Sequence, residues 1–281
     1  GSTEPLTATT LHMFPLIRGW TDVQRSPEAN LRLGLVLSFV AGATNAGGFL
    51  AVGRYTSHMT GMLSSVADNL VTGQIYLALA AVMSLLAFLG GAMTSAWMVN
   101  WGLRRNLQSA YGRPLLLEAA LLLLFGLFGS GISFFGVLFV PLTVLVLCFI
   151  MGLQNAVITK ISHAEIRTTH VTGLVTDLGI ELGKLFYINR LTRDTLVRAN
   201  RQKLGLLAKL IGSFFIGGLV GAIGFKTIGY IATVPLAILF AEGLLQRPEL
   251  AGFIAVYAPV IGAFALGWAL LHRRRAPVPV A

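Results

Sequence analysis

Long apolar segments alternate with short polar ones along most of this chain. The apolar segments lie at about 31–53, 75–101, 114–130, 133–158, 204–225, 229–245 and 250–271. Each is long enough, or nearly so, to cross a hydrocarbon layer of about 30 Å at about 1.5 Å per helical residue. The pattern therefore predicts an all-α fold, a polytopic bundle of transmembrane helices.

Two segments, 57–70 and 170–183, are too polar to face lipid. Fourteen residues of helix would reach only about 21 Å. Their acids include Asp68, Asp177 and Glu181, and an acid exposed to lipid costs about 2.5–3.5 kcal/mol on insertion scales. We therefore expect two polar half-helices that pack inside the protein.

The two polar segments carry the same motif. At a constant offset of 112 residues, the first copy has His58, Thr60 and Gly61 and the second has His170, Thr172 and Gly173. Upstream, Asn45-Ala46 matches Asn155-Ala156, and the preceding apolar span is expected to break there. The sequence thus predicts two internal repeats, over 31–132 and 133–249.

The positions of lysine and arginine suggest how the repeats are oriented. If the half-helices do not fully cross, the basic tracts near the N-terminus, at 102–113 and at 184–203 all lie on one side, taken as cytoplasmic. The two repeats are then inverted, as in many transporters. Arg273 to Arg275 would fall on the opposite side if both last segments span, so the side of the C-terminus stays open.

Both ends of the chain differ from the repeats. Residues 1–30 form a polar tail, whose Gly1-Ser2 is typical of a cloning remnant, and no signal peptide precedes Arg32. Residues 250–281 are expected to add one helix and a basic tail. The N-terminus is expected to be cytoplasmic.

The motifs resemble those of the YoaK family of bacterial inner-membrane proteins. The first repeat reads "AGATNAGGFLAVG" and then "SHMTG", and the second reads "MGLQNA" and then "TTHVTG". Asn45 stands where the family usually has Asp, and Met62 where it usually has Asn. The resemblance covers most of residues 33–245 and implies a bacterial inner-membrane protein of unknown function, often supposed to be a transporter.

Composition supports a multi-pass membrane protein. Only 11% of residues are charged and the mean hydropathy is +0.77, whereas a soluble domain carries about 25% charged residues. The net charge of +10 lies in short tracts suited to anionic lipid. We expect the lipid bilayer as partner, no nucleic acid and no cofactor. A homo-oligomer is compatible with the sequence.

The repeated motif suggests an anion site. Ser57 and Thr169 are good N-cap residues, and helix N-termini inside a membrane favour anions. Arg54 and Arg167 lie close before them, and Gly61 and Gly173 leave room for a ligand. Alternatively, the hydroxyl groups only cap, the glycines only pack and the arginines reach lipid headgroups.

Three further residues, His58, His170 and Asp177, are candidates for proton coupling, because they titrate near neutral pH or become able to when buried. The alternative is ordinary hydrogen bonding, and for Glu181 a pair with Lys184. No metal site is predicted, since neither histidine has other ligands at the usual spacing.

Amide side chains at the expected breaks complete the candidate binding set. They are Asn45, Gln154 and Asn155, which could hydrogen-bond a polar ligand or satisfy freed backbone groups. The full set of expected substrate-binding residues is Asn45, Arg54, Ser57, His58, Thr60, Gly61, Gln154, Asn155, Thr169, His170, Thr172 and Gly173.

We expect a secondary transporter of a small polar solute, with an anion or weak acid favoured, and not an enzyme. Motifs for a serine protease, a zinc protease, a dinucleotide site and a P-loop are missing. The alternatives are an uncoupled channel or facilitator, and a membrane scaffold or receptor. Transport or a channel is favoured if the two His-x-Thr-Gly segments meet around one cavity.

Overall fold

The computed structural model describes residues 26–237, apart from 108–109, 130–131, 163–165 and 189–195. The described part is helical and has no strand. Its helices are α1 (Pro27–Val52), α2 (Met59–Val71), α3 (Ile75–Arg104), α4 (Gly112–Gly129), α5 (Ile132–Ile161), α6 (Val171–Leu185) and α7 (Arg201–Ile228), and a 3-10 turn, η2 (Gly229–Ala232), follows. The all-α prediction is confirmed.

Four segments of the described chain are long and apolar enough to cross a membrane: Pro27–Leu50, Ile75–Arg104, Pro141–Ile161 and Arg201–Ala237. The second and fourth expose large apolar side chains along one side, such as Leu89, Met93 and Trp97 in α3. These side chains have no protein cover in the monomer, so they suit contact with lipid tails.

The helix bounds agree with most of the predicted apolar segments. The segment 229–245 begins as the 3-10 helix η2 and continues as an α-helix over 233–237. Its residues after 237 lie outside the described part. The same holds for 250–271 and Arg273 to Arg275.

The expected breaks at Asn45 and Asn155 are wrong. Helix α1 continues through Asn45 to Val52, and α5 continues through Asn155 to Ile161. The reason for the end of α1 is Gly53, which has a φ of 68° and donates its N–H to Phe49, the usual glycine C-terminus of a helix. Both asparagines lie within intact helices, and their side chains form hydrogen bonds with Ser57 and Thr169.

Helices α3 and α5 cross at backbone contact. A Cβ atom on Gly91 of α3 would overlap the carbonyl oxygen of Phe149, and one on Gly152 of α5 would overlap that of Phe88. The two glycines therefore allow an approach that other residues would prevent.

Helices α1 and α7 cross in the same way. A Cβ atom on Gly42 of α1 would overlap the carbonyl oxygen of Phe214, and one on Gly217 of α7 would overlap that of Phe39. Gly221, one turn later, lies equally close to the backbone of Ala43. Gly217 and Gly221 thus serve close helix packing.

The two crossings use the same residue types at corresponding places. Phe39 and Gly42 in α1 correspond to Phe149 and Gly152 in α5, 110 residues later, and Phe88 and Gly91 in α3 correspond to Phe214 and Gly217 in α7, 126 residues later. The first helix of each sequence repeat thus packs against the third helix of the other.

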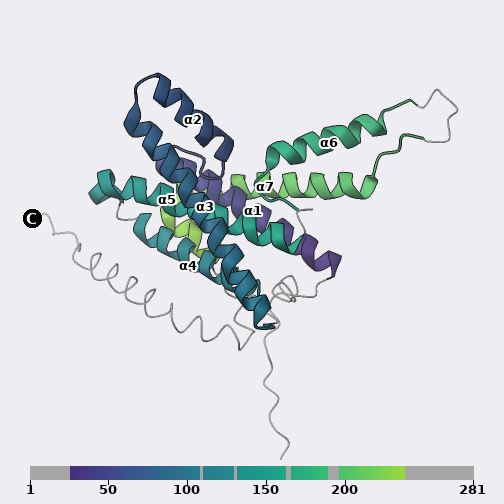
Figure 1. The fold of residues 1–281 in the computed structure, drawn as a ribbon, viewed down its shortest axis with the longest axis horizontal. Coiled ribbons are helices and arrows are strands. Elements are labelled where there is room, and N and C mark those ends of the chain that lie inside the picture. Colours follow the sequence, from purple (N-terminus) through teal and green to yellow (C-terminus); the bar gives the residue numbers. More distant parts are fainter. Residues whose placement is uncertain (1–25, 108–109, 130–131, 163–165, 189–195, 238–281) are drawn as a thin grey trace, which may run out of the picture.

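The short helices form two arms at the edges of this core. Helix α2 folds back along the first part of α3, and α6 lies along the first part of α7 (Figure 1). The arms point in different directions, while the first residues of α2 and α6 lie near the middle of the molecule (Figure 1).

Candidate functional site

The first turns of α2 and α6 line one cavity of about 560 Å³. Its walls come from both halves of the chain. The lining residues are Asn45, Tyr55, Ser57, His58, Met59, Thr60, Phe88, Thr169, His170, Val171, Thr172 and Phe214. The two His-x-Thr-Gly segments therefore meet at one place although they are 112 residues apart.

In the first repeat, Asn45 fixes the segment that leads into α2. Its Oδ1 atom accepts a hydrogen bond from the backbone N–H of Ser57 at 3.2 Å and another from the Ser57 hydroxyl at 3.0 Å. A single amide in α1 thus positions the chain just before His58, at the rim of the cavity.

The second repeat uses the corresponding residues. The hydroxyl of Thr169 donates to Oδ1 of Asn155 at 2.7 Å, and Nδ2 of Asn155 donates to the carbonyl of Met151, one turn earlier in α5. The Asn–Ser and Asn–Thr bonds explain why both repeats carry an asparagine before the polar segment. They also explain why neither asparagine ends its helix.

The predicted N-caps are wrong by one residue. His58 and His170 occupy the N-cap positions, and neither side chain bonds to the first turn of its helix. The hydroxyls of Ser57 and Thr169 are engaged with Asn45 and Asn155 instead. The first turns of α2 and α6 therefore receive no hydrogen bond from the side chain of their N-cap residue.

Not all candidate residues reach the cavity. Arg54 and Arg167 do not line it, and Arg167 is exposed. Gln154 is buried away from it, and its Nε2 atom donates to the carbonyl of Leu37 at 2.5 Å. Asn155 does not line the cavity but accepts a hydrogen bond from Thr169, which does. The structure therefore brings together Asn45, Ser57, His58, Thr60, Thr169, His170 and Thr172, and leaves the two arginines outside.

The aromatic walls were not identified from the sequence. Phe88 and Phe214 line the cavity from α3 and α7, and Tyr55 adds a third ring. Both phenylalanines are the residues whose carbonyls contact Gly152 and Gly42. Their correspondence at an offset of 126 residues is visible in the sequence once the helix pairs are known.

Four buried oxygen atoms near the repeated segments lack partners among the described residues. They are Oγ1 of Thr44, Thr56 and Thr168 and Oε1 of Gln154. Thr56 and Thr168 correspond at the offset of 112, and Thr44 and Gln154 correspond at 110. Unsatisfied buried oxygens are uncommon in folded proteins. Here they occur at corresponding positions of the two halves.

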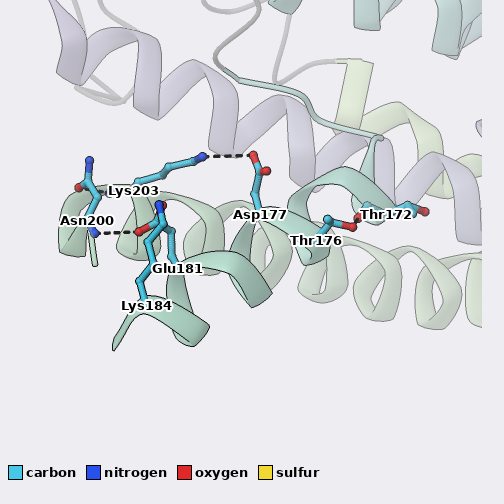
Figure 2. A network of polar contacts seen from close by, with 7 residues as sticks. All are labelled: Thr172, Thr176, Asp177, Glu181, Lys184, Asn200 and Lys203. Carbon is cyan, nitrogen blue, oxygen red and sulfur yellow. Dashed lines mark hydrogen bonds and ion pairs between the residues drawn. The ribbon is translucent and has the colours of Figure 1, made fainter. Parts of the chain in front are cut away.

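The predicted acids of the second segment lie away from the cavity, between α6 and α7. Asp177 pairs with Lys203 at 3.4 Å, and its side chain is 47% exposed. Glu181 is buried, accepts from Lys184 at 2.8 Å and accepts from the backbone N–H of Asn200 at 2.8 Å. Figure 2 shows both acids bridging the two helices.

These contacts explain Glu181 as a structural residue. Asn200 caps α7 through its own side chain, which accepts from the N–H of Lys203 at 3.0 Å. Glu181 thus holds the N-cap residue of the next helix, and the expected pair with Lys184 is confirmed. Among the described residues, no group of three His, Cys, Asp or Glu side chains is placed to share a metal ion.

The Glu181 contacts predict a pH-dependent stability. Glu181 lies outside the four candidate spans, and the hydrogen bond from Lys184, followed by that from Asn200, lowers the pKa of its carboxyl below the ordinary value of 4.5. A lowered folded-state pKa stabilises the fold above the unfolded-state value, and this contribution disappears as pH falls through the folded-state value. We expect the melting temperature of the parent to fall toward that of Glu181→Gln below about pH 4.5. A constant difference between the two proteins down to pH 3 would contradict this assignment.

Comparisons with known proteins agree on the kind of molecule. Residues 33–245 match the family described as protein of unknown function (DUF1275). The UPF0700 transmembrane protein YoaK of Bacillus subtilis (strain 168) is 26% identical over 228 residues, which are 77% of this chain and 94% of that protein. No solved structure matches the chain. With its apolar helices and its transmembrane relative, this chain is a membrane protein, and it belongs to the DUF1275 family.

Proposed function

We propose that this protein is a secondary transporter of a small polar solute, and that the cavity between α2 and α6 binds the solute. One observation carries the proposal: the two copies of the His-x-Thr-Gly segment line the same cavity. A scaffold has no need of a cavity lined by both halves of the chain, whereas a site shared by two repeats is common in transporters.

The proposed transporter consists of two inverted repeats, over residues 31–132 and 133–249. The matched glycine crossings and the matched asparagine bonds support this division. In it, α2 and α6 are half-helices, since 13 and 15 residues span only about 20–23 Å. We place the protein in the bacterial inner membrane with a cytoplasmic N-terminus, on the basis of the basic tracts.

The lining favours an anion or weak acid over a cation. Its described lining residues include two histidines and the first turns of two helices, and none of them carries a carboxylate. Those turns carry the positive ends of the helix dipoles. Hydroxyl groups of Thr60 and Thr172 offer further hydrogen bonds.

Proton coupling through His58, His170 and Asp177 is part of this proposal. Both histidines line the cavity and are exposed to it, so protonation of either would add positive charge beside a bound anion. Binding and protonation would then strengthen each other. Asp177 could exchange a proton only by releasing Lys203.

A facilitator without coupling is the second candidate. It is favoured by the position of Asp177, which is paired with Lys203 and does not line the cavity. A facilitator would use the same cavity and the same lining residues. The accumulation experiment in the Discussion distinguishes the two.

Solute binding can be tested by thermal stability. We expect at least one compound from a screen of small anions, neutral solutes and cations to stabilise the parent. At 100 times its dissociation constant it would add about 2.7 kcal/mol, a shift of several degrees. Val171→Trp should abolish the shift, because Val171 lines the cavity.

Val175→Trp is the matched control for this experiment. Val175 lies one turn later in α6, is exposed and does not line the cavity. It should keep the ligand-dependent shift of the parent. If no compound stabilises the parent, or if both tryptophan variants respond equally, the cavity is not the binding site.

A further inference from the structure

The two histidines of the repeated motif differ in one respect. A Cβ atom placed on Gly61 would overlap the ring of His58, at Cδ2 and Nε2, so that ring lies directly against Gly61. A Cβ atom placed on Gly173 would meet nothing within 4 Å, so the ring of His170 does not lie against Gly173. Each histidine is followed three residues later by a glycine, Gly61 or Gly173. We call the surface of that glycine the ring-packing position of the histidine.

The difference is confined to the side chains. His58 has φ −91° and ψ 70°, and His170 has φ −81° and ψ 54°, so the backbone of the two N-cap residues is nearly the same. Both histidines are exposed and line the cavity. A rotation about the side-chain bonds alone would move either ring onto or off its glycine, and exposed side chains rotate within nanoseconds.

Glycine at the third position of each helix calls for an explanation. Among the described glycines, positive φ values occur at Gly53, Gly73 and Gly229, and not at Gly61 or Gly173. Glycine is a poor helix former, so a backbone in ordinary helical geometry gives no reason for it. The ring of His58 supplies the reason at Gly61, and in this conformation nothing supplies one at Gly173.

We propose that the two ring-packing positions are occupied in turn. In the conformation seen here His58 packs on Gly61 and His170 is free to contact a solute, and in the opposite conformation His170 packs on Gly173 and His58 is released. This inference rests on the proposed function, because exchange between two equivalent halves is how inverted repeats open to opposite sides. It assigns Gly61 and Gly173 as positioning residues and His170 as the histidine that contacts solute in this conformation.

The test measures the reactivity of each histidine toward diethyl pyrocarbonate in the full chain in liposomes, read by mass spectrometry of the modified peptides. Gly61→Ala should displace the His58 ring and raise its reactivity, while His170, now the ring that packs, becomes less reactive. Gly173→Ala should do the reverse. If the two conformations are about equally populated, locking one changes the packed fraction of each ring about twofold.

The control is Gly179→Ala in α6, where a Cβ atom also meets nothing within 4 Å. It should change neither histidine, and His12, His163 and His272 provide an internal reference in every sample. Alanine favours the helix more than glycine does, so the variants should fold. A Gly173→Ala protein with unchanged His58 and His170 would overturn the proposal, as would changes confined to the substituted repeat.

Failure of this inference and failure of the transport proposal give different results. The modification experiment needs no solute. If no solute stabilises the protein, binding at the cavity is refuted. The histidine reactivities would still test the ring exchange. A solute that binds, together with histidines that do not respond across the repeats, would overturn the ring exchange and leave transport in place.

Discussion

Gly152→Leu is expected to destabilise the protein strongly. The Cβ atom alone would overlap the carbonyl oxygen of Phe88, and a backbone group cannot rotate away as a side chain can. Helices α3 and α5 would have to separate, and overpacking of this kind costs about 3 kcal/mol at its usual upper end. Thermal unfolding should show a melting temperature lower by about 6–12 °C, or no folded protein.

Two further variants make the Gly152 experiment specific. Gly42→Leu should be as harmful, because a Cβ atom there would overlap the carbonyl oxygen of Phe214 in the corresponding crossing. Gly212→Leu lies in α7, where a Cβ atom meets nothing within 4 Å, and should change the melting temperature little. Equal changes of the melting temperature in all three variants would contradict the assignment of Gly152 and Gly42 to the helix contacts.

His170→Gln is expected to abolish proton-driven accumulation of the solute. One pH unit corresponds to about 1.4 kcal/mol per proton, so a transporter moving one proton per solute can concentrate it about tenfold. His170 lines the cavity, and glutamine keeps hydrogen bonding but cannot carry a proton at neutral pH. In proteoliposomes with an imposed gradient of one unit, accumulation should fall from about tenfold to about onefold.

Asp177→Asn tests the second coupling residue, and Lys203→Met is its matched control. Both variants break the Asp177–Lys203 pair, but only the first removes the carboxyl group. A loss of accumulation in Asp177→Asn alone would support a proton on that carboxyl. If His170→Gln and Asp177→Asn both concentrate the solute as the parent does, coupling through these residues is wrong. If the parent itself equilibrates the solute without concentrating it, a facilitator is favoured.

The helices could be predicted because their signal is local. Each is an apolar run, and the bounds of α3 and α5 differ from the predicted segments by three residues or fewer. The polar segments were also recognisable, because Asp68 and Asp177 interrupt an otherwise apolar chain. The repeat of His58, Thr60 and Gly61 is a property of the sequence itself.

Hydrogen bonds between distant residues could not be predicted in the same way. Asn45 and Asn155 were expected to break helices, because an amide inside an apolar helix lacks an evident partner. The partners, Ser57 and Thr169, are 12 and 14 residues away. These bonds took the two hydroxyls that were expected to cap α2 and α6, and so moved both N-caps by one residue.

The sequence by itself determined the class of the protein, the helices and the pair of matched motifs, since these depend on composition and spacing. Only the tertiary structure decided that the motifs meet, because α1 reaches α7 and α3 reaches α5 through glycines whose partners lie far away in the chain. It placed Phe88 and Phe214 in the cavity wall and left Arg54 and Arg167 outside. Charge and spacing predict which residues could bind an anion, but the path of the backbone decides which of them face the same space.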